Sequence, residues 1–587
     1  MRNWTAGFVV ATVSALSSGM IGRSASATPQ PARASPAVEL DTERSVVGQP
    51  PPPTPIQPVS RSNRTSVAAS EAATHARSLY AAGQVEDAAR EAFRVVSGDA
   101  SDDAESREVA QFELAKALYN LELYGTATSL FSDIADRPNH PKDPETLLWL
   151  GRLALRSPAP ANLAGRVGRY GADDVEALGR EQPEVYAELV FLLGRFKYDQ
   201  RQFAEALSLF ARVPPVANPR FNSRIYAEAQ LFAGIANVQM HRSKPAIEAF
   251  RTVVALADRG KLTSEAAARL RDLATLSLAR LYYSASFPLD EMTNLPLVNA
   301  KPLTLALKHW NGVDERSEYW PDAMFEKSWA YFMSGDYRMA LGQIHTLKSP
   351  YLQRASYPEA SVLEAFIYFR NCRNDESLAL AAQILVRYEP VRDELGKLVD
   401  SLVPGDEGDE ALYRLLLDVR SGHTTLSPTL AIEIRNAMSD RELSRFSAQV
   451  NAIDDEARRL QGGLTGLKLS KLGDFVAASI RQERVRTIEG AGELARAGFR
   501  RILANLSEQI ASAKRVILSV QTQTHYLVDN KSQLAMLTTR VNIGPEPHVF
   551  RPDDGPYDTY VAWPFNGEYW LDELSTYRQV IDSKCGQ

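Results

Sequence analysis

One two-helix pattern recurs between Gln111 and Tyr388, and it constrains the fold of this chain more than any other feature. Its clearest copy places Gly194 on a first helix and Ala206 twelve positions later on a second helix. Phe210 follows four positions after that alanine, on the same helical face. Further copies keep these positions: Gly234, Ala246 and Phe250, then Trp329, Phe332, Gly335, Tyr337, Ala340 and Ile344.

This spacing predicts packing between pairs of short antiparallel helices. Small residues such as Gly194 and Ala206 let two helices approach closely, and the aromatic residue fills the space beside them. Repeats of about 34 residues with this spacing are typical of a tetratricopeptide array. Weaker copies on both sides bring the total to about six to eight repeats. We therefore predict an all-α chain whose main part is a tetratricopeptide α-solenoid over residues 67–390.

The first segment, residues 1–27, has the three regions of an export signal. Arg2 is positive, Trp4–Val13 is a short apolar run, and Ala25-Ser26-Ala27 fits a cleavage site. The run is too short to span a bilayer, so we expect a periplasmic mature chain without a transmembrane segment. A disordered N-terminus is the alternative. Residues 28–66 are rich in Pro and Ser and predict a disordered linker.

Two further regions follow the repeats. Residues 391–428 contain the acidic run Asp406–Glu410, which we expect to be a solvated loop within a transition segment of loops and helices. Residues 429–537 predict a coiled coil, because apolar residues recur alternately three and four positions apart. Glycines 462, 463 and 466 favour an antiparallel hairpin over an intermolecular coiled coil, and Gly490 and Gly492 offer a second place for its turn. The seam residues are Leu443, Phe446, Val450, Ile453, Ala457 and Leu460, then Phe499, Leu503, Leu506, Ile510, Ala513, Ile517, Val520, Thr524 and Leu527.

The last segment, residues 538–587, is rich in Gly, Pro and aromatic residues. Asn566-Gly567 between aromatic flanks predicts a hairpin turn, and Leu571–Leu574 predicts a short helix. The aromatic residues either form a binding platform or cap the helices before them, and the sequence leaves both alternatives open. Cys372 and Cys585 are the only two cysteines, and they either form one disulfide or remain separate buried thiols.

Composition and motifs argue against several function classes. A formal net charge of −6 does not provide the basic footprint that nucleic-acid binding needs. The eight His residues include no metal-binding pair at helical spacing, and phosphate-loop and Gly-x-Ser-x-Gly motifs are missing. We therefore predict no metal, no cofactor and no enzymatic activity. The alternative is an envelope enzyme subunit that acts on polysaccharide or peptidoglycan through a dispersed site.

The predicted function is that of a scaffold that binds other envelope proteins. In a tetratricopeptide array the first helix of each pair lines the inner face, and with Gly194 at the close contact, Arg195, Tyr198 and Asp199 turn toward that face. The same reasoning adds Gln239, Glu326 and Arg370. The aromatic residues Trp563, Phe565, Tyr569 and Trp570 complete the predicted partner-binding set. Plain solvation of an exposed helix face is the alternative for the helical residues.

The signal segment, the array, the coiled coil and the stretch from Trp563 to Leu574 together resemble a known family. It is the periplasmic tetratricopeptide-repeat protein of the myxobacterial adventurous gliding machinery, the AglT or GltE type. The architecture covers nearly the whole chain, although the repeat motif is specific for the fold alone and the Pro-rich segment has no counterpart. The resemblance implies an envelope scaffold that links inner- and outer-membrane components of a motility complex.

Overall fold

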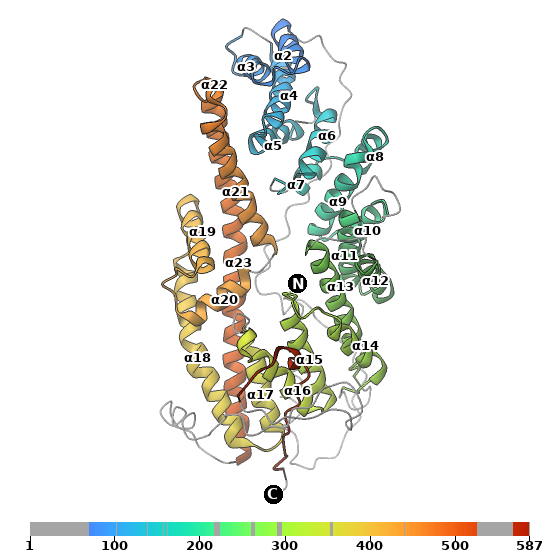
Figure 1. Ribbon diagram of the computed structural model, residues 1–587, viewed down its shortest axis with the longest axis vertical. Coiled ribbons are helices and arrows are strands. Elements are labelled where there is room, and N and C mark those ends of the chain that lie inside the picture. The colour runs from blue at the N-terminus through green and yellow to red at the C-terminus, as the bar shows by residue number, and fades with distance from the viewer. Residues whose placement is uncertain are drawn as a thin grey trace, which may run out of the picture.

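The computed structural model describes residues 70–100, 103–137, 139–156, 158–160, 163–215, 223–259, 265–289, 296–352, 356–438, 441–524 and 567–585. Within these ranges every regular element is a helix, apart from one isolated bridge between Leu289 and Pro296. The predicted order of solenoid, helical hairpin and short C-terminal segment is confirmed (Figure 1). The export signal, the linker and the turn at Asn566 lie outside the described residues.

The solenoid consists of successive helix pairs. In chain order they are α2 (Glu71–Ala81) with α3 (Val85–Val96), α4 (Ala104–Asn120) with α5 (Tyr124–Ala135), α6 (Asp143–Ala154) with α7 (Leu163–Val167) and α8 (Ala172–Glu181), α9 (Pro183–Asp199) with α10 (Phe203–Phe210), α11 (Ser223–Gln239) with α12 (Ser243–Asp258), α13 (Glu265–Ser284) with α14 (Ala300–Asn311), α15 (Trp320–Ser334) with α16 (Tyr337–Leu347), and α17 (Pro358–Arg370) with α18 (Asn374–Ser401). These eight sets agree with the expected number of repeats. The third is irregular, because two short helices replace its second helix.

The close contacts within the pairs lie where the spacing predicts them. Ala206 and Ala246 are completely buried. A Cβ atom added to Gly194 would lie 2.6 Å from the Phe210 ring, and one added to Gly234 would overlap the Phe250 ring in the same way. Each ring therefore packs on the bare backbone of the first helix of its own pair, which confirms the register.

Six pairs reverse direction through a residue with positive φ. These residues are Gly83, Glu122, Arg201, His241, Gly335 and Cys372. Each lies seven positions after a small close-contact residue, respectively Ala76, Ala115, Gly194, Gly234, Ser328 and Ala365. Because this backbone conformation is unfavourable for residues with a side chain, the packing of each pair fixes its turn more than the turn residue does.

The predicted coiled coil forms an antiparallel hairpin. Its first helix is α21 (Arg441–Gly462), its tip contains α22 (Thr465–Lys468), and its second helix is α23 (Lys471–Thr524). The turn therefore uses the glycines at 462–466, whereas Gly490 and Gly492 lie inside α23. Since α23 has 54 residues and α21 has 22, the two helices pair over only part of α23.

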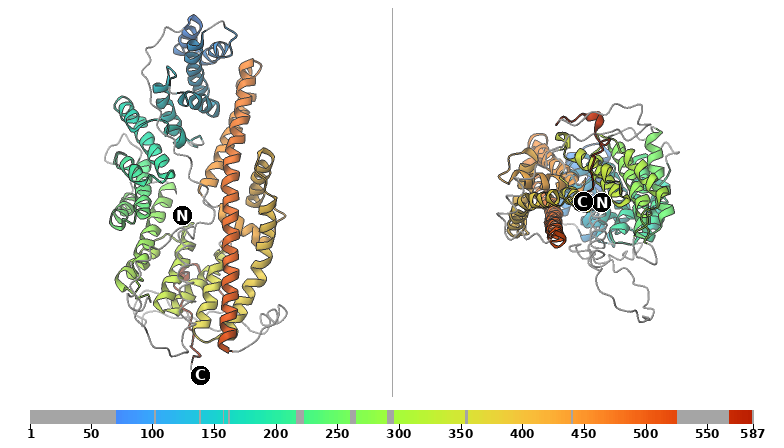
Figure 2. Two further views of the ribbon diagram at one scale, coloured as in Figure 1. Left: turned by 180° about the vertical axis from the view of Figure 1, so that it is seen from behind. Right: turned by 90° about the horizontal axis from the view of Figure 1, so that it is seen from below.

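The rest of α23 packs on the solenoid instead of on another coiled-coil strand. Its seam residues Phe499, Leu506 and Val520 are buried in the core that also contains residues of α15, α17 and α18. Figures 1 and 2 show α23 along the length of the molecule, with α17 and α18 beside its C-terminal part. The helix α23 thus packs on α21 along its first part and on the last repeats of the solenoid along its C-terminal part.

The structure corrects two expectations about the end of the solenoid. The last repeat does not stop near Pro390, because α18 continues through that proline to Ser401 and packs along α23. The acidic run is not a solvated loop but the first turn of α19 (Asp406–Ser421), which α20 (Pro428–Met438) follows. Carboxylates are favourable at a helix N-terminus, and Asp409 also forms a buried ion pair with Arg496 of α23.

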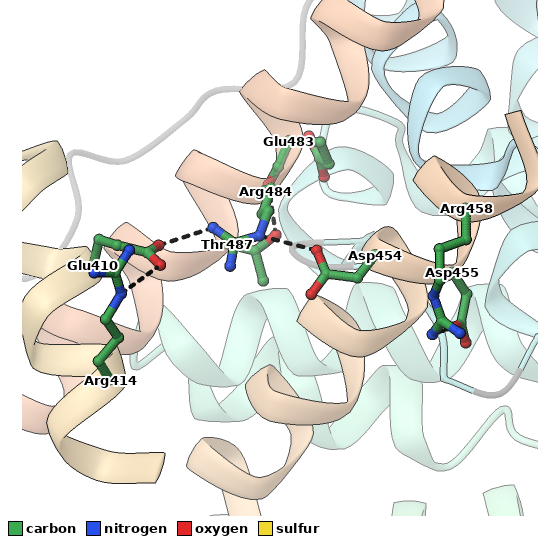
Figure 3. A network of polar contacts seen from close by, with 8 residues as sticks. All are labelled: Glu410, Arg414, Asp454, Asp455, Arg458, Glu483, Arg484 and Thr487. Atoms are coloured by element: carbon green, nitrogen blue, oxygen red, sulfur yellow. Dashed lines mark hydrogen bonds and ion pairs between the residues drawn. The ribbon is translucent and has the colours of Figure 1, made fainter. Parts of the chain in front are cut away.

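An ion-pair network joins α19, α21 and the first part of α23. The Arg484 guanidinium lies 2.8 Å from a carboxylate oxygen of Glu410 on α19 and 3.0 Å from one of Asp454 on α21 (Figure 3). Asp455, the neighbour of Asp454, pairs instead with Arg458 on an exposed face of α21. The adjacent carboxylates Asp454 and Asp455 therefore have structural partners.

Residues 567–585, here called the C-terminal strap, cross α16 and the turn between α17 and α18. The Ser575 N–H donates to Thr346 Oγ1 at 3.0 Å, and the Gln579 N–H donates to the Arg338 carbonyl at 3.1 Å. The strap can approach because Gly342 has no side chain, and a Cβ there would collide with the backbone of Tyr577. The expected short helix is the 3₁₀ turn η4 (Leu571–Glu573).

A disulfide fixes the end of the strap. Cys585 is bonded to Cys372, with a Cα–Cα distance of 5.0 Å across a sequence separation of 213. Leu574, Tyr577 and Ile581 are buried against the last repeats. Of the alternatives that the sequence left open, the structure adopts the disulfide, and this part of the C-terminal segment acts as a cap.

Candidate partner-binding surface

Four consecutive first helices carry a cation immediately after the small close-contact residue. Arg77 follows Ala76, Lys116 follows Ala115, Arg152 follows Gly151 and Arg195 follows Gly194. In the later repeats the same position holds Ile235, Arg280, Trp329 or Phe366. We call Arg77, Lys116, Arg152 and Arg195 the cationic row. Because these residues share one register on successive first helices, we expect them to lie on the same face of the array.

The first two members of the row share a buried carboxylate. Glu113 Oε1 lies 3.2 Å from Arg77 Nε, and Glu113 Oε2 lies 2.8 Å from Lys116 Nζ. The Arg77 side chain is 47 % exposed. Lys116 Nζ also lies 4.4 Å from the centre of the Tyr80 ring, whose hydroxyl accepts a hydrogen bond of 2.7 Å from the Asn120 amide. The α2–α4 surface therefore combines two cations, an amide and a half-buried tyrosine.

The third pair continues this surface with two arginines on aromatic rings. The Arg152 guanidinium lies 4.6 Å from the Trp149 ring, and that of Arg156 lies 4.2 Å from the Tyr124 ring. Tyr119 of α4 bridges the pairs, since its ring contacts both Tyr124 and Trp149 edge-on. Such cation–π contacts hold a guanidinium in place without neutralising its charge.

The positive charge of Arg152 acts on Tyr80, a residue of the α2–α4 surface. Burial raises the pKa of Tyr80, while the hydrogen bond from Asn120 and the positive charge of Arg152 act in the opposite direction. Arg152 thus acts on the hydroxyl that Asn120 contacts. Because the Tyr119 ring of α4 also lies 5.2 Å from the Trp149 ring of α6, the first three repeats contribute to a single patch.

On α9 the structure brings together the three residues predicted there. The Arg195 guanidinium stacks on Phe232 of α11 at 4.0 Å and lies 3.8 Å from Asp199. The Tyr198 ring packs against Phe203 and Phe232, so it contributes to the joint between two repeats. Asp199 is exposed, and Gln239 is exposed at the corresponding position of α11. We therefore expect Arg195, Asp199 and Gln239, more than the Tyr198 ring, to be available to a partner.

The expected surface position of Glu326 is wrong. Its side chain is 7 % exposed, and its carboxylate accepts hydrogen bonds from Arg280 Nη2 at 2.6 Å and from Trp310 Nε1 at 2.9 Å. The reason is register, because Glu326 precedes the close-contact residue Ser328 by two positions and faces the previous repeat. Burial raises the pKa of Glu326, and the Arg280 charge opposes that shift.

The remaining predicted residues lie at the C-terminal end. Arg370 is exposed at the end of α17, four repeats after Arg195, the last member of the cationic row. In the strap, the Tyr569 ring stacks on His345 at 4.8 Å, whereas Trp570 is 59 % exposed. Trp563 and Phe565 lie outside the described residues. The predicted residues therefore do not form one site.

The hairpin tip contacts the N-terminal repeats through their second helices and through the turn before α5. Phe475 of α23 packs on Phe93 of α3, and Arg459 of α21 lies 3.0 Å from the Glu122 carboxylate. The Gly125 N–H at the start of α5 donates to Glu456 Oε1 at 2.8 Å. Glu456 thereby supplies the cap that Leu123, at the N-cap position of α5, cannot provide. This contact leaves the first helices of these repeats uncovered by the hairpin tip.

Sequence reasoning missed Arg77, Lys116, Arg152 and Arg156. A signal for the first three was present, because the register that selected Arg195 selects them in the weaker repeats as well. Within the described ranges, no group of three or more His, Cys, Asp or Glu residues could hold a metal ion. Within the same ranges, no helix combines the length and hydropathy needed to cross a membrane.

Comparison with known proteins identifies no family. No protein-family model and no curated protein matches the sequence. Among solved structures, a monomeric IFIT1 mutant with Gppp-AAAA matches with 14 % identity over 72 % of this chain and 89 % of its own, at a TM-score of 0.23. The human IFIT1 dimer with m7Gppp-AAAA matches with 12 % identity over 71 % of this chain and 90 % of its own, at a TM-score of 0.20. Similarity at these TM-scores is too low to transfer a function.

Proposed function

We propose that this protein is a non-catalytic scaffold that binds segments of other proteins on the first helices of its N-terminal repeats. The cationic row carries this proposal, because four consecutive repeats present the same charge in the same register. A face that is only solvated has no reason to keep one charge sign from repeat to repeat. Solenoids use such continuous surfaces to hold extended partners.

Affinity capture from cell-envelope extracts tests the scaffold proposal. Because the Tyr198 ring packs between two repeats, the informative variant is Arg195→Ala combined with Tyr198→Phe, which keeps that ring. The matched control replaces two exposed lysines, Lys244→Ala with Lys301→Ala, on α12 and α14. We expect the first variant to recover less of the partner than the control and the wild type. Equal recovery by all three proteins would contradict the use of this surface.

The absence of catalysis is part of the same proposal. What supports it is that Glu456 and His140, two described groups whose pKa values are strongly shifted, lie in separate packing environments. Burial raises the pKa of Glu456 to about 7 against α5, and it lowers the pKa of His140 to about 4 before α6. A catalytic site would bring such groups within hydrogen-bond reach of one another. Release of soluble fragments from peptidoglycan by the purified protein, above that by boiled protein, would contradict this part.

The narrower proposal assigns the scaffold to the periplasm and to a gliding-motility complex. Its support is the export signal over residues 1–27 and the resemblance carried by the stretch from Trp563 to Leu574. The Cys372–Cys585 disulfide is compatible with an oxidising compartment. Mass spectrometry of the mature protein should find Thr28 as the first residue. A cytoplasmic protein that begins at Met1 would contradict the periplasmic assignment.

A further inference from the structure

The patch formed by α2, α4, α6 and the residues directly after α6 has an unbalanced positive charge. It contains Arg77, Lys116, Arg152 and Arg156, and the acid that pairs within it is Glu113. That carboxylate is buried and already shared by Arg77 and Lys116. Among the described residues, Arg152 and Arg156 have no ion-pair partner. This surplus is local, since the whole chain has a formal net charge of −6.

The cations of the patch are held in place by aromatic rings. Lys116 lies on Tyr80, Arg152 on Trp149 and Arg156 on Tyr124, at 4.4, 4.6 and 4.2 Å from the ring centres. A side chain that is already oriented loses little conformational entropy when it binds a ligand. The guanidinium N–H groups of the two arginines remain available for the two oxygens of a carboxylate.

We infer that this patch binds an extended acidic segment of a partner protein, an inference that rests on the scaffold proposal and specifies its ligand. Packed helices lie about 8–10 Å apart, and an extended chain advances about 3.3 Å per residue. Carboxylates at every third residue of the segment therefore match cations on successive first helices. The Asn120 amide and the Tyr80 hydroxyl, which lie in the same patch, suit the backbone groups of such a segment.

The direct test uses two fluorescent peptides of twelve residues with the same composition. One has Glu at every third position with Ser, Gly and Tyr between them, and the other has its four Glu residues together at one end. Titration of the purified full chain, followed by fluorescence anisotropy at low salt, gives the two affinities. We expect the spaced peptide to bind about tenfold more tightly and to lose affinity as salt is added. Equal binding of the two peptides would overturn the inference.

Matched variants locate the binding. Arg152→Gln with Arg156→Gln should weaken the spaced peptide by about tenfold or more, while Lys244→Gln with Lys301→Gln should leave its affinity unchanged. An equal loss in both variants would show non-specific attraction and would overturn the inference. Should the first variant melt at a lower temperature, Arg152→Glu replaces it and is titrated with four spaced peptides, each with one Glu replaced by Lys. Tighter binding of one of these peptides than of the original spaced peptide supports the assignment, and the lack of any such gain contradicts it.

Two further outcomes separate this inference from its rivals. A single-stranded oligonucleotide that displaces the spaced peptide and binds more tightly than it would make the patch a nucleic-acid site and overturn the inference. If both peptides fail to bind while affinity capture still depends on Arg195, the scaffold proposal is supported, and the inference of an acidic ligand is contradicted. If capture also becomes independent of Arg195, both proposals fail.

Discussion

The first and last repeats share one fold but use their first helices differently. After the close-contact residue, the first repeats carry Arg77 and Lys116, and the last two carry Trp329 and Phe366. Three positions farther along, Tyr80 and Tyr119 correspond to Phe332 and Phe369. The N-terminal positions combine charge with a hydroxyl, whereas the C-terminal positions are apolar aromatic. The same scaffold position therefore supports either recognition or packing.

What differs physically, within the described residues, is which helices of the repeats the rest of the chain packs on. At the C-terminal end, α23 packs on α17 and α18, and the C-terminal strap crosses α16. The Glu359 carboxylate at the start of α17 even accepts a hydrogen bond of 2.5 Å from the Asn505 amide of α23. At the N-terminal end, the hairpin tip contacts second helices through Gly125 and Phe93. Among the described residues, the last two first helices carry aromatic residues at this position, at the end where α23 and the strap pack, and the four N-terminal first helices carry cations.

The largest expected difference concerns two ion pairs in equivalent positions. Arg280 pairs with Glu326 as Arg77 pairs with Glu113, but Arg280 and Glu326 are both buried while Arg77 is half exposed. Glu326→Gln leaves a buried guanidinium without its ion-pair partner, so it should reduce the free energy of unfolding by about 3–5 kcal/mol. Glu113→Gln should cost less, about 1–2 kcal/mol, because water can solvate Arg77 and the Tyr80 ring still contacts the Lys116 ammonium. Chemical denaturation of both variants measures the difference, and equal losses would contradict the comparison.

The second difference concerns the strap, which only the C-terminal end possesses. Replacing Cys372 and Cys585 by Ala should reduce the free energy of unfolding by about 2–4 kcal/mol, because the unfolded chain is no longer cross-linked. Hydrogen exchange should speed up in α16 and in the strap, while α2 to α5 keep their protection. Increased exchange at both ends of the solenoid would show that the strap stabilises more than the last repeats.

The third difference is the pH response of two contacts of the hairpin. One joins Glu456 of α21 to the start of α5, and the other joins α23 to the last repeats. Burial raises the pKa of Glu456 from its ordinary value of 4.5 to about 7, while the Gly125 N–H and Arg459 act against that shift. The folded protein therefore binds this proton more tightly than the unfolded chain does. The stabilisation is fully present below about pH 4.5 and is lost as the pH rises through about 7, which amounts to about 3 kcal/mol at most. The contact of Phe499 and Leu506 with the last repeats is apolar and has no such response.

Melting temperatures between pH 4.5 and pH 8 test this response. Glu456→Gln keeps an oxygen that can accept the Gly125 N–H but does not titrate, so its stability should change less across this range than that of the wild type. Hydrogen exchange in α5 should follow the same pattern. Parallel pH curves for the variant and the wild type would assign the response to another group.

The smallest expected effect concerns the turns between paired helices. His241 adopts φ 56°, whereas the corresponding turn of the later α15–α16 pair uses Gly335 at φ 83°. His241→Gly should therefore stabilise the protein by about 0.5–1 kcal/mol, and Gly335→Ala should destabilise it by a similar amount. Thermal unfolding of the two single variants measures both signs. Destabilisation by His241→Gly would show that the imidazole contributes more than the turn conformation costs.

Much of the fold could be predicted because its determinants are steric and local. Each glycine–phenylalanine pair, such as Gly194 with Phe210 or Gly234 with Phe250, specifies one contact between two helices. The same spacing recurs along the chain and predicts the same contact in each repeat. The glycines at 462–466 likewise marked the hairpin turn. A heptad seam specifies an apolar stripe but not its partner, so the sequence did not reveal that Phe499 and Leu506 pack on the solenoid.

The candidate site was less predictable because it depends on the register of weak repeats and on contacts between distant segments. Arg195 was found from a strong copy, while Lys116 and Arg152 required the same register in copies with few diagnostic residues. Glu326 was misplaced because its carboxylate meets Arg280, 46 positions earlier, inside the protein. The pairing of Cys372 with Cys585 spans 213 positions and has no local sequence signal.

One measurement tests the central contrast between the two ends most directly. A photo-crosslinking amino acid is placed at Arg152, on the cationic row, or at Glu359, which contacts Asn505 of α23. After irradiation of cells, mass spectrometry identifies the peptides joined to each position. We predict that position 359 crosslinks within the chain to α23 and that position 152 crosslinks to another protein. Crosslinks from position 152 mainly to the chain's own hairpin would contradict this contrast.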